Sequence, residues 1–502
     1  MFVFRFFCNR LRAMVYAGLV FFFLKPASAQ IAHFSPAALH KLETAARRVA
    51  QDSLLCHAEW AVTVADVASG EILLDSNGQK SVAPASNLKL FTSAAALDLL
   101  GPRHRFQTAL GYAGPVQGGV LQGNLVLTGG GDPTLGYSRQ EGWLDMAGVL
   151  SRWVRAVQRA GIREIRGNLV ADVSFFDPVQ VPDGWLWMDI GNYYGAGPSA
   201  LNFNENQYRL VLRPGKEPGA PARVLATKPK VAGLSFFNLM RTGPAGSGDN
   251  GYIYGGPEQF RRLLHGTVPA GPDRFAIKGS LPDPALFCLQ ALRDSLRSAG
   301  IALRGKLKVS YRPVTVDRRL DLLPSPPLKE IVYWLNKKSI NLYAEVLLKH
   351  LGVAKFGEGN FEKGLEAVRD FLRENDVSLE GVALFDGSGL SPLDVITTQA
   401  MVQLLAAVAR KPYFQPFYDS LPVAGVKDDS GHLSNLCRGT PAAGNLRAKT
   451  GLIERVRAHS GYVRAANGRL LAFSMIANDH TGTAAQIDRL HERIMILLAG
   501  LR

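Results

Sequence analysis

The sequence has few cysteines, four among 502 residues. One of them, Cys8, precedes a predicted cleavage site, and the other three, Cys56, Cys288 and Cys437, allow at most one internal disulfide. A disulfide-rich scaffold is therefore excluded, and the pairing of the three stays open. None of them stands in a zinc-type cluster and no H-E-x-x-H segment is present, so no metal site is expected. The chain also lacks a G-x-x-x-x-G-K-S/T loop, and no cofactor is expected.

Long apolar runs are missing as well, except near the N-terminus. Three arginines precede an apolar run of 11 residues, 14–24, and Ala27-Ser28-Ala29 follows it. This order is typical of a secretory signal peptide, so we predict that residues 1–29 are removed after export to the periplasm. The alternative is an uncleaved anchor. No other stretch reaches the roughly 18 apolar residues of a spanning helix, so we expect no stable membrane span.

Acidic residues are fewer than basic ones. The sequence has 42 aspartates and glutamates and 57 lysines and arginines, which gives a net charge of +15. Loss of residues 1–29 removes four basic residues and leaves about +11. Such a charge favours an acidic partner or surface. Recognition of nucleic acid would depend on this charge alone, without a supporting motif, so we expect no nucleic-acid partner.

Both ends of the mature chain combine strands with helices. Near its start, a Ser-Pro pair caps a helix predicted over 37–51, and strands are predicted over 60–67 and 71–74. Near its end, an Asn-Gly turn joins two strands within 460–476, and a helix is predicted over 486–501. This similarity suggests that the two ends belong to one domain.

The middle of the chain, residues 101–317, has a different sequence pattern. Short β-rich runs alternate there with turns rich in glycine and proline. A chain of 502 residues is also too long for one ordinary domain. We therefore expect an α/β domain built from residues 30–100 and 318–502, interrupted by a mostly β insertion over 101–317 that forms two subdomains.

The stretch V-A-P-A-S-N-L-K-L-F-T-S-A-A-A-L, residues 82–97, predicts a loop that runs into an apolar helix. Ser86 and Lys89 are three residues apart, so they share one face of that helix. A serine becomes a strong nucleophile when a base takes its proton. A lysine can be that base if burial or nearby cations lower its pKa, and the apolar run after Lys89 favours burial. The alternative is a capping serine followed by a surface lysine.

Two later segments carry groups that suit the same chemistry. Ser339-Ile340-Asn341, between two predicted helices, offers a hydroxyl and an amide that can face a substrate or relay a proton. Lys449-Thr450-Gly451, before the late hairpin, can bind a substrate carboxylate, and its glycine permits close approach. The alternatives are a capping serine with a loop asparagine, and a basic strand end with a turn glycine. The order S-x-x-K, S-x-N, K-T-G closely matches the set found in penicillin-binding proteins and class A β-lactamases.

With these motifs the chain resembles the low-molecular-mass penicillin-binding proteins of the D-alanyl-D-alanine carboxypeptidase/endopeptidase type, class C. The large insertion between S-x-x-K and S-x-N belongs to the resemblance, as do G-G-G-D-P-T-L at 129–135 and D-G-S-G-L-S at 386–391. The resemblance covers essentially the whole mature chain. It implies an α/β (α+β) fold of the transpeptidase type, with an antiparallel sheet and helices, interrupted by the insertion.

The resemblance also implies a function. The protein would be a serine DD-peptidase that cleaves D-alanyl-D-alanine ends, or the peptide cross-links, of peptidoglycan, and β-lactams would acylate it. Ser86 would carry the acyl group, Lys89 would be the general base, and Ser339 would relay a proton to the leaving amine. The implied substrate-binding residues are Asn341, Lys449, Thr450, Gly451 and Leu452. Backbone N–H groups of Ser86 and Leu452 would form the oxyanion hole.

The sequence departs from the family pattern in several places, including Pro392, the segment 426–433 and two positions in or next to the motifs. Ile340 stands where aspartate is common, and Leu452 replaces the usual threonine or serine after K-T-G, which removes a hydroxyl near the substrate carboxylate. One alternative is therefore a peptidoglycan-binding or penicillin-sensing protein with little catalysis. The other is a serine β-lactamase, although no E-x-x-L-N segment is present to position a deacylating water. The sequence leaves the oligomeric state open.

Overall fold

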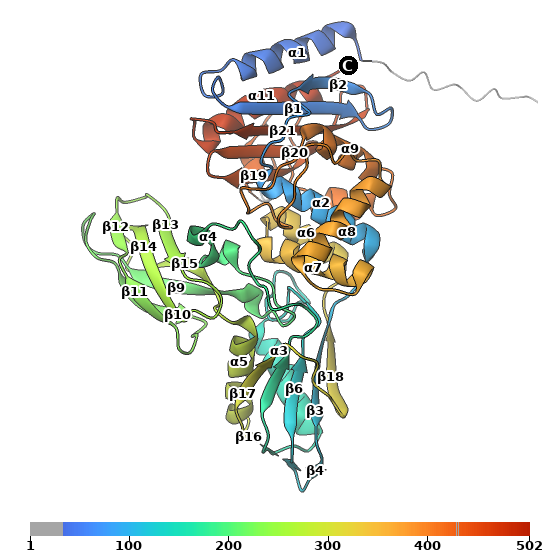
Figure 1. Cartoon of the computed structure of the whole chain (residues 1–502). Coiled ribbons are helices and arrows are strands. Elements are labelled where there is room, and N and C mark those ends of the chain that lie inside the picture. The colour runs from blue at the N-terminus through green and yellow to red at the C-terminus, as the bar shows by residue number, and fades with distance from the viewer. Residues whose placement is uncertain (1–33, 428, 430) are drawn as a thin grey trace, which may run out of the picture.

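The computed structural model of the chain describes residues 34–427, 429 and 431–502 (Figure 1). The predicted signal peptide, residues 1–29, lies outside the described residues. Among those that are described, no helix combines the length and the apolar character needed to cross a bilayer. The first described helix, α1, spans Pro36–Ala50, and the Ser35 side chain caps it as predicted.

A five-stranded antiparallel sheet joins the two ends of the chain. Its strand order is β19-β20-β21-β1-β2, and β1 pairs along its whole length with β21. The predicted early strand pair and the predicted late hairpin therefore lie in one sheet, and the predicted α/β fold with an antiparallel sheet is confirmed. The strands are β1 Glu59–Asp66, β2 Ile72–Ser76, β19 Arg447–Ile453, β20 Val456–Arg464 and β21 Leu470–Asn478.

Helices cover both faces of this sheet (Figure 1). One face packs against α1 and against α11, Ala484–Ala499. The other face packs against α9, Thr398–Val408, with α2, Lys89–Leu99, nearby. Further helices surround α2: α6 Leu328–Lys338, α7 Asn341–Phe356, α8 Phe361–Glu374 and α10 Phe414–Ser420. Helix α7 is buried around its whole circumference over its first three turns, and a few polar side chains, among them Glu345 and Lys349, are buried there with the apolar ones.

Part of the inserted region lies below this first part in Figure 1. It contains a five-stranded sheet of order β17-β8-β6-β3-β18 and a smaller sheet of order β16-β7-β5-β4. Helices α3, Met146–Arg159, and α5, Pro284–Ser298, pack beside these sheets. The strands are β3 Gln107–Ala113, β4 Val116–Gln117, β5 Val120–Leu121, β6 Asn124–Thr128, β7 Glu164–Ile165, β8 Leu169–Asp172, β16 Ala302–Leu303, β17 Leu307–Ser310 and β18 Arg318–Pro324.

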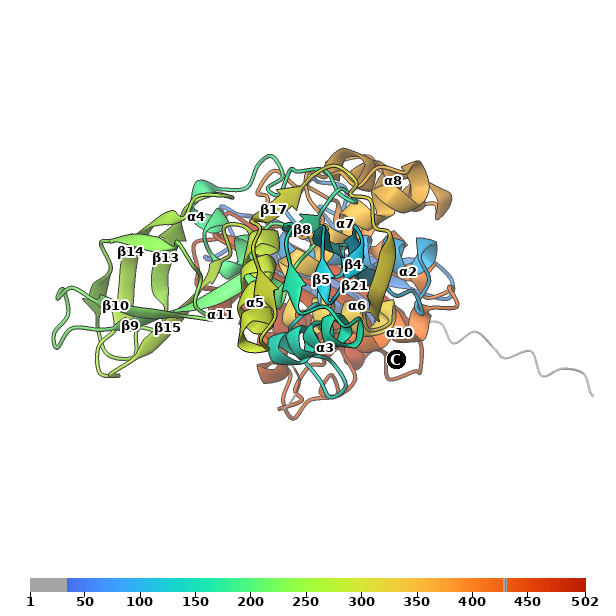
Figure 2. The same ribbon diagram turned by 90° about the horizontal axis from the view of Figure 1, so that it is seen from below.

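The rest of the inserted region forms a lobe that projects sideways in both views (Figures 1 and 2). The lobe contains a sheet of order β10-β9-β15 and a second sheet in which β14 pairs with β11, β12 and β13. Its interior includes the buried side chains of Leu210, Ile253 and Ile277. The strands are β9 Gln207–Arg213, β10 Arg223–Lys228, β11 Ser235–Asn238, β12 Arg241–Gly243, β13 Asn250–Tyr254, β14 Arg261–Pro269 and β15 Phe275–Ser280.

We propose that these two groups of sheets are the two subdomains of the insertion. Strand β18 pairs with β3 as far as Pro324, so the sheet continues beyond residue 317, where the sequence suggested a return to the first domain. Helix α6 begins only at Leu328. In this proposal the second boundary lies between these two elements.

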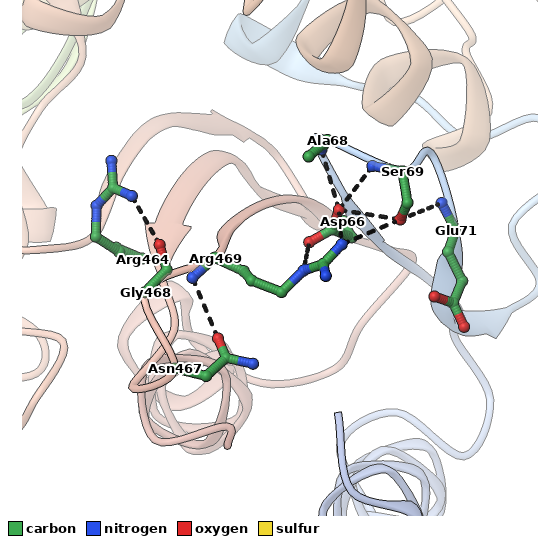
Figure 3. A network of polar contacts seen from close by, with 8 residues as sticks. All are labelled: Asp66, Ala68, Ser69, Glu71, Arg464, Asn467, Gly468 and Arg469. Atoms are coloured by element: carbon green, nitrogen blue, oxygen red, sulfur yellow. Dashed lines mark hydrogen bonds and ion pairs between the residues drawn. The ribbon is translucent and has the colours of Figure 1, made fainter. Parts of the chain in front are cut away.

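A buried ion pair ties the turn after β1 to the hairpin between β20 and β21 (Figure 3). The Asp66 carboxylate accepts hydrogen bonds from Arg469 Nε and Nη2, both at 2.6 Å, and from the backbone N–H groups of Ala68 and Ser69. Burial alone would raise the pKa of Asp66, but the contacts with Arg469 and Ser69 lower it to about 2. The ionised carboxylate is therefore strongly favoured in the folded protein.

We predict that Asp66→Asn lowers the free energy of unfolding by about 2–3 kcal/mol at neutral pH, because Arg469 loses a buried charged partner. In the parent protein the contribution of Asp66 is complete above pH 3.8 and is lost as the pH falls through about 2. Thermal unfolding from pH 7 to pH 2 measures both effects. The matched control is Glu43→Gln, which removes an exposed ion pair with Arg47. Equal thermal midpoints for the two variants would contradict the prediction.

Candidate active site

Ser86 lies in a single turn of 3₁₀ helix, η1, Ala85–Leu88, that leads directly into α2. Its side chain is partly exposed, whereas its neighbours Ala85 and Asn87 are buried. The residue before it, Ala85, has a φ of 46°, a left-handed conformation that is uncommon for residues other than glycine. The turn therefore presents Ser86 on a strained backbone at the start of a buried helix.

Lys89 is the first residue of α2, and its side chain is completely buried. Its Nζ donates hydrogen bonds to Ser86 Oγ at 2.9 Å and to the backbone oxygen of Ser388 at 2.7 Å. Ser86 and Lys89 thus lie side by side, as their three-residue spacing requires. In its neutral form the amine would have a lone pair, and Lys89 Nζ could then accept the proton of the serine hydroxyl across the same short distance.

The charge on Lys89 is set by two opposing effects. Burial disfavours the ammonium, whereas the nearby carboxyl groups of Asp386, Glu345 and Asp394 favour it. Burial prevails and lowers the pKa of Lys89 to about 8. Burial also raises the pKa of Glu345 and that of Asp394, and in both cases the charge of Asp386 adds to the effect. A lysine with this pKa is neutral in about a tenth of the molecules at pH 7, and in about half of them at pH 8.

The loop that accepts a hydrogen bond from Lys89 is organised by Asp386. The Asp386 carboxylate accepts the indole N–H of Trp185 at 2.8 Å, and Trp185 belongs to the inserted region. It also accepts four consecutive backbone N–H groups, those of residues 388–391. The segment D-G-S-G-L-S was noted in the sequence, but nothing in it indicated this role. An aspartate followed by small residues typical of turns is the signal that was available.

A second pair of polar side chains comes from the two later motifs. Ser339 ends α6 with a φ of 55°, and its Oγ accepts a hydrogen bond from Lys449 Nζ at 2.9 Å. Lys449 is buried and also donates to the backbone oxygen of Thr450 at 2.7 Å. Asn341 begins α7, and its Nδ2 donates to the backbone oxygen of Tyr194 at 2.8 Å. Asn341 therefore links the motif to the inserted region.

Strand β19 lies against the turn that carries Ser86 because Gly451 has no side chain. A Cβ atom at Gly451 would lie 2.6 Å from the backbone oxygen of Pro84 and 3.2 Å from Cβ of Ala85. Thr450 is partly exposed beside it, and Leu452 exposes half of its surface. The glycine of K-T-G thus fixes the distance between the two motifs.

A buried ion pair supports β19 from β20 and α11. Arg457 donates hydrogen bonds to the two carboxylate oxygens of Asp488 through Nε and Nη2, and the Nη2 contact is 3.0 Å long. Its Nη1 donates to the backbone oxygen of Gly451 at 3.3 Å. Gly451 and Leu452 share that peptide group, so Arg457 helps to orient the N–H of Leu452. This pair could not be predicted from the sequence, since an arginine in a strand and an aspartate in a helix carry no local signal.

The pKa of Lys449 is lowered well below its usual range, chiefly by burial and further by the positive charges of Lys89 and Arg457. This coupling also shows that Lys449 lies close to Lys89. The structure therefore brings the three motifs to one place, with a hydroxyl beside each lysine. Such a pair of hydroxyl and amine groups can support nucleophilic attack and proton transfer.

The described part of the chain also contains residues of the types that bind metals, and three cysteines. No group of three or more histidine, cysteine, aspartate or glutamate residues there has a geometry suited to a metal ion. The three described cysteines are free, with Cys56 exposed and Cys288 and Cys437 buried. Burial raises the pKa of Cys437 to about 12, which makes it a poor nucleophile.

Comparison with known proteins identifies the family. Residues 42–496 match the model of the D-Ala-D-Ala carboxypeptidase 3 (S13) family. The chain belongs to this family. It is 34% identical over 501 residues to a D-alanyl-D-alanine carboxypeptidase of Actinomadura sp. (strain R39), with 95% of this chain and 88% of the relative covered. The protein is thus a serine D-Ala-D-Ala carboxypeptidase, and its activity on the cell wall places it outside the cytoplasm.

Solved structures show the same fold. The crystal structure of penicillin binding protein 4 from Haemophilus influenzae has a TM-score of 0.78 at 24% identity, covering 90% of this chain and 99% of that chain. A second structure of that protein, complexed with a novel β-lactam, has a TM-score of 0.74 at 23% identity over the same shares. The predicted fold type and the resemblance seen in the sequence are therefore confirmed.

We predict that Gly451→Ala slows acylation by penicillin about 10²-fold, because the added methyl group pushes β19 away from the Ser86 turn and misaligns the reacting groups. The control is Gly500→Ala at the end of α11, where the nearest atoms are 3.6 Å from the new Cβ. Acylation is followed by intact mass, and thermal unfolding checks the fold. An unchanged rate in Gly451→Ala would show that the spacing is not critical.

Proposed function

We propose that Ser86 is the acylated nucleophile of this carboxypeptidase and that Lys89 is its general base. The observation that carries the proposal is the 2.9 Å contact between Lys89 Nζ and Ser86 Oγ, made by a completely buried lysine whose pKa is lowered to about 8. A serine hydroxyl needs such a base. Few of the remaining polar groups in the described structure combine burial, reach and a suitable pKa in this way.

The other motifs take the roles of proton relay and substrate contacts in this proposal. Ser339 passes a proton to the leaving amine, helped by Lys449 at 2.9 Å. Asn341 holds the amide of the substrate peptide. Lys449 and Thr450 face the terminal carboxylate, and Gly451 permits its close approach. The N–H groups of Ser86 and Leu452 form the oxyanion hole.

The reaction would proceed in two steps of acyl transfer. Ser86 Oγ bonds to the carbonyl carbon of the penultimate D-alanine while its proton moves to Lys89 Nζ. The C–N bond to the terminal D-alanine then breaks, and the proton held by Lys89 passes through Ser339 to the leaving amine, so that Lys89 is neutral again. In the second step water bonds to the ester carbon and gives a proton to Lys89. The C–O bond to Ser86 then breaks, Lys89 returns the proton to Ser86 Oγ, and the shortened peptide leaves as its carboxylic acid.

The same serine would react with β-lactams, whose strained amide opens to give an acyl-enzyme. A crystal structure of a protein with this fold holds a β-lactam, which supports this part of the proposal. The natural substrates would be peptidoglycan peptides, as D-alanyl-D-alanine ends, as cross-links, or as both. Export with removal of residues 1–29 would place the enzyme in the periplasm.

We predict that Ser86→Ala abolishes acylation by a fluorescent penicillin and lowers the rate of D-alanine release by roughly 10⁴–10⁶-fold. The fold should remain, because Lys89 Nζ keeps its hydrogen bond to the backbone oxygen of Ser388 when the Ser86 hydroxyl is removed. The control is Ser81→Ala, which removes an exposed serine hydroxyl bonded to the Gly381 backbone oxygen. Normal turnover by Ser86→Ala would overturn the assignment of the nucleophile. A stable adduct on the parent protein alone would support it.

We predict that the rate of penicillin acylation rises with pH and levels off above about 8, because Lys89 acts in its neutral form. The pH profile of the acylation rate between pH 6 and 10 measures this. Lys89→Arg should lose activity by roughly 10³-fold or more, since an arginine stays protonated over this range. The control is Lys80→Arg at an exposed ion pair. A flat profile in the parent would contradict the role of Lys89.

A further inference from the structure

The lobe formed by residues 207–280 carries much of the excess positive charge of the protein. It contains eleven lysines and arginines but only four acidic residues. The register and exposure of the β10-β9-β15 sheet place several of the basic side chains on one outer face. The sheet lies in the lobe at the left of Figure 2. We call this surface the basic face and define it by Arg209, Arg213, Arg223, Lys228 and Lys278.

The register of the sheet places like charges directly opposite one another. Arg209 of β9 has Lys228 of β10 on one side and Lys278 of β15 on the other. Arg213 of β9 lies opposite Arg223 of β10. Directly opposed like charges destabilise an antiparallel sheet, so folding alone does not account for this pattern.

Small or apolar residues separate the two basic rows. Val211, Ala226 and Ala276 occupy the positions between them on the three strands. The rows are four residues apart on β9, which corresponds to roughly 13 Å, and neighbouring strands are about 5 Å apart. The basic face therefore presents two rows of cations separated by small or apolar side chains.

These cations lack protein counter-ions. Throughout residues 34–427, 429 and 431–502, no ion pair within 4.0 Å involves any of the five members of the basic face. Four of them are exposed and Lys278 is half-buried. Glu205 is the acidic group whose charge acts on the pKa of Lys278, and it is already paired with Arg139. The basic face is thus free to bind an external anion.

The basic face begins beside the active site. Lys278 Nζ lies 5.0 Å from the centre of the Tyr193 ring, and the Tyr193 and Tyr194 rings are 5.4 Å apart. The backbone oxygen of Tyr194 accepts the hydrogen bond from Asn341. Three successive contacts therefore connect the basic face to a residue of the S-x-N motif.

We propose that the basic face binds the free carboxylates of acidic stem peptides that neighbour the peptide held in the active site on the same peptidoglycan strand. This inference rests on the proposed function, because the occupant is the polymer on which Ser86 would act. Guanidinium groups pair well with carboxylates, and three of the five cations are arginines. The contacts that connect the basic face to Asn341, at the start of α7, favour the substrate polymer over an unrelated phosphate-bearing surface.

The test is a charge-reversal variant with Arg209→Glu, Arg213→Glu, Arg223→Glu and Lys228→Glu. Lys278 is left unchanged because it contacts Tyr193 near the active site. The control reverses four exposed basic residues on or next to β17 and β18, with Lys306→Glu, Lys308→Glu, Arg318→Glu and Arg319→Glu. The two variants carry the same net charge, so a difference between them reports position and not total charge.

Binding to purified sacculi is measured by co-sedimentation at about 50 mM and about 500 mM NaCl. Each variant is also examined with Ser86→Ala present, so that binding is separated from turnover. We expect binding at low salt to be roughly tenfold or more weaker for the basic-face variant, with little change for the control. Hydrolysis of intact sacculi should fall similarly, whereas acylation by penicillin and hydrolysis of a short soluble peptide should not.

Three outcomes would overturn the inference. Equal binding by the two variants would show that position does not matter. Loss of penicillin acylation in the basic-face variant would show damage to the active site. A defect seen with phosphatidylglycerol vesicles but not with sacculi would identify a phosphate surface as the occupant. Failure of the proposed function would instead appear as normal turnover by Ser86→Ala, which does not affect sacculus binding.

Discussion

Burial of the Lys89 side chain is the constraint on which the rest of the active site depends. An ammonium group removed from water is costly unless hydrogen bonds and opposite charges replace its hydration. The structure supplies the Ser388 backbone oxygen, the Ser86 hydroxyl and three nearby carboxyl groups. Compensation is incomplete, since the pKa of Lys89 still falls. This partial compensation is what makes a buried lysine usable as a base.

The same constraint explains why segments distant in sequence pack so closely. The loop that contains Ser388 can reach Lys89 only if it lies against the Ser86 turn and against α7. A Cβ at Gly389 would lie 1.9 Å from the backbone oxygen of Ala85, and one at Gly387 would lie 2.9 Å from that of Ala344. Both positions therefore require glycine. The Asp386 carboxylate then holds the loop by accepting hydrogen bonds from the backbone N–H groups of the loop. It also connects the loop to Trp185 of the inserted region.

Much of the fold could be predicted from the sequence because its signals are local. The Ser35 cap, the alternation in the early strands and the Asn-Gly turn each act within a few residues, and the corresponding elements are present. The placement of Ser86 and Lys89 on one face is also local, since helical geometry sets it. The second boundary of the insertion depends on a long-range contact, because β18 is defined by its partner β3, about 200 positions earlier.

The supporting residues of the site could not be predicted for the same reason. Glu345 lies within the apolar stretch of α7, and its importance arises only when the fold brings Lys89 to it. Arg457 and Asp488 come from a strand and a helix that meet through tertiary packing. Long-range electrostatic partners of this kind leave no periodic pattern, whereas motifs such as S-x-x-K and K-T-G can be read directly.

The charges around Lys449 show how the site would respond to its substrate. Asp488 neutralises Arg457, and three carboxyl groups lie near Lys89, but the charges that influence Lys449 are both positive. Lys449 therefore has no acidic partner among the residues that the structure describes. In the proposed mechanism the terminal carboxylate of the peptide supplies such a partner, which would raise the pKa of Lys449 and favour its ammonium form. Substrate binding would then charge the lysine next to Ser339 and leave Lys89 neutral, as proton transfer from Ser86 requires.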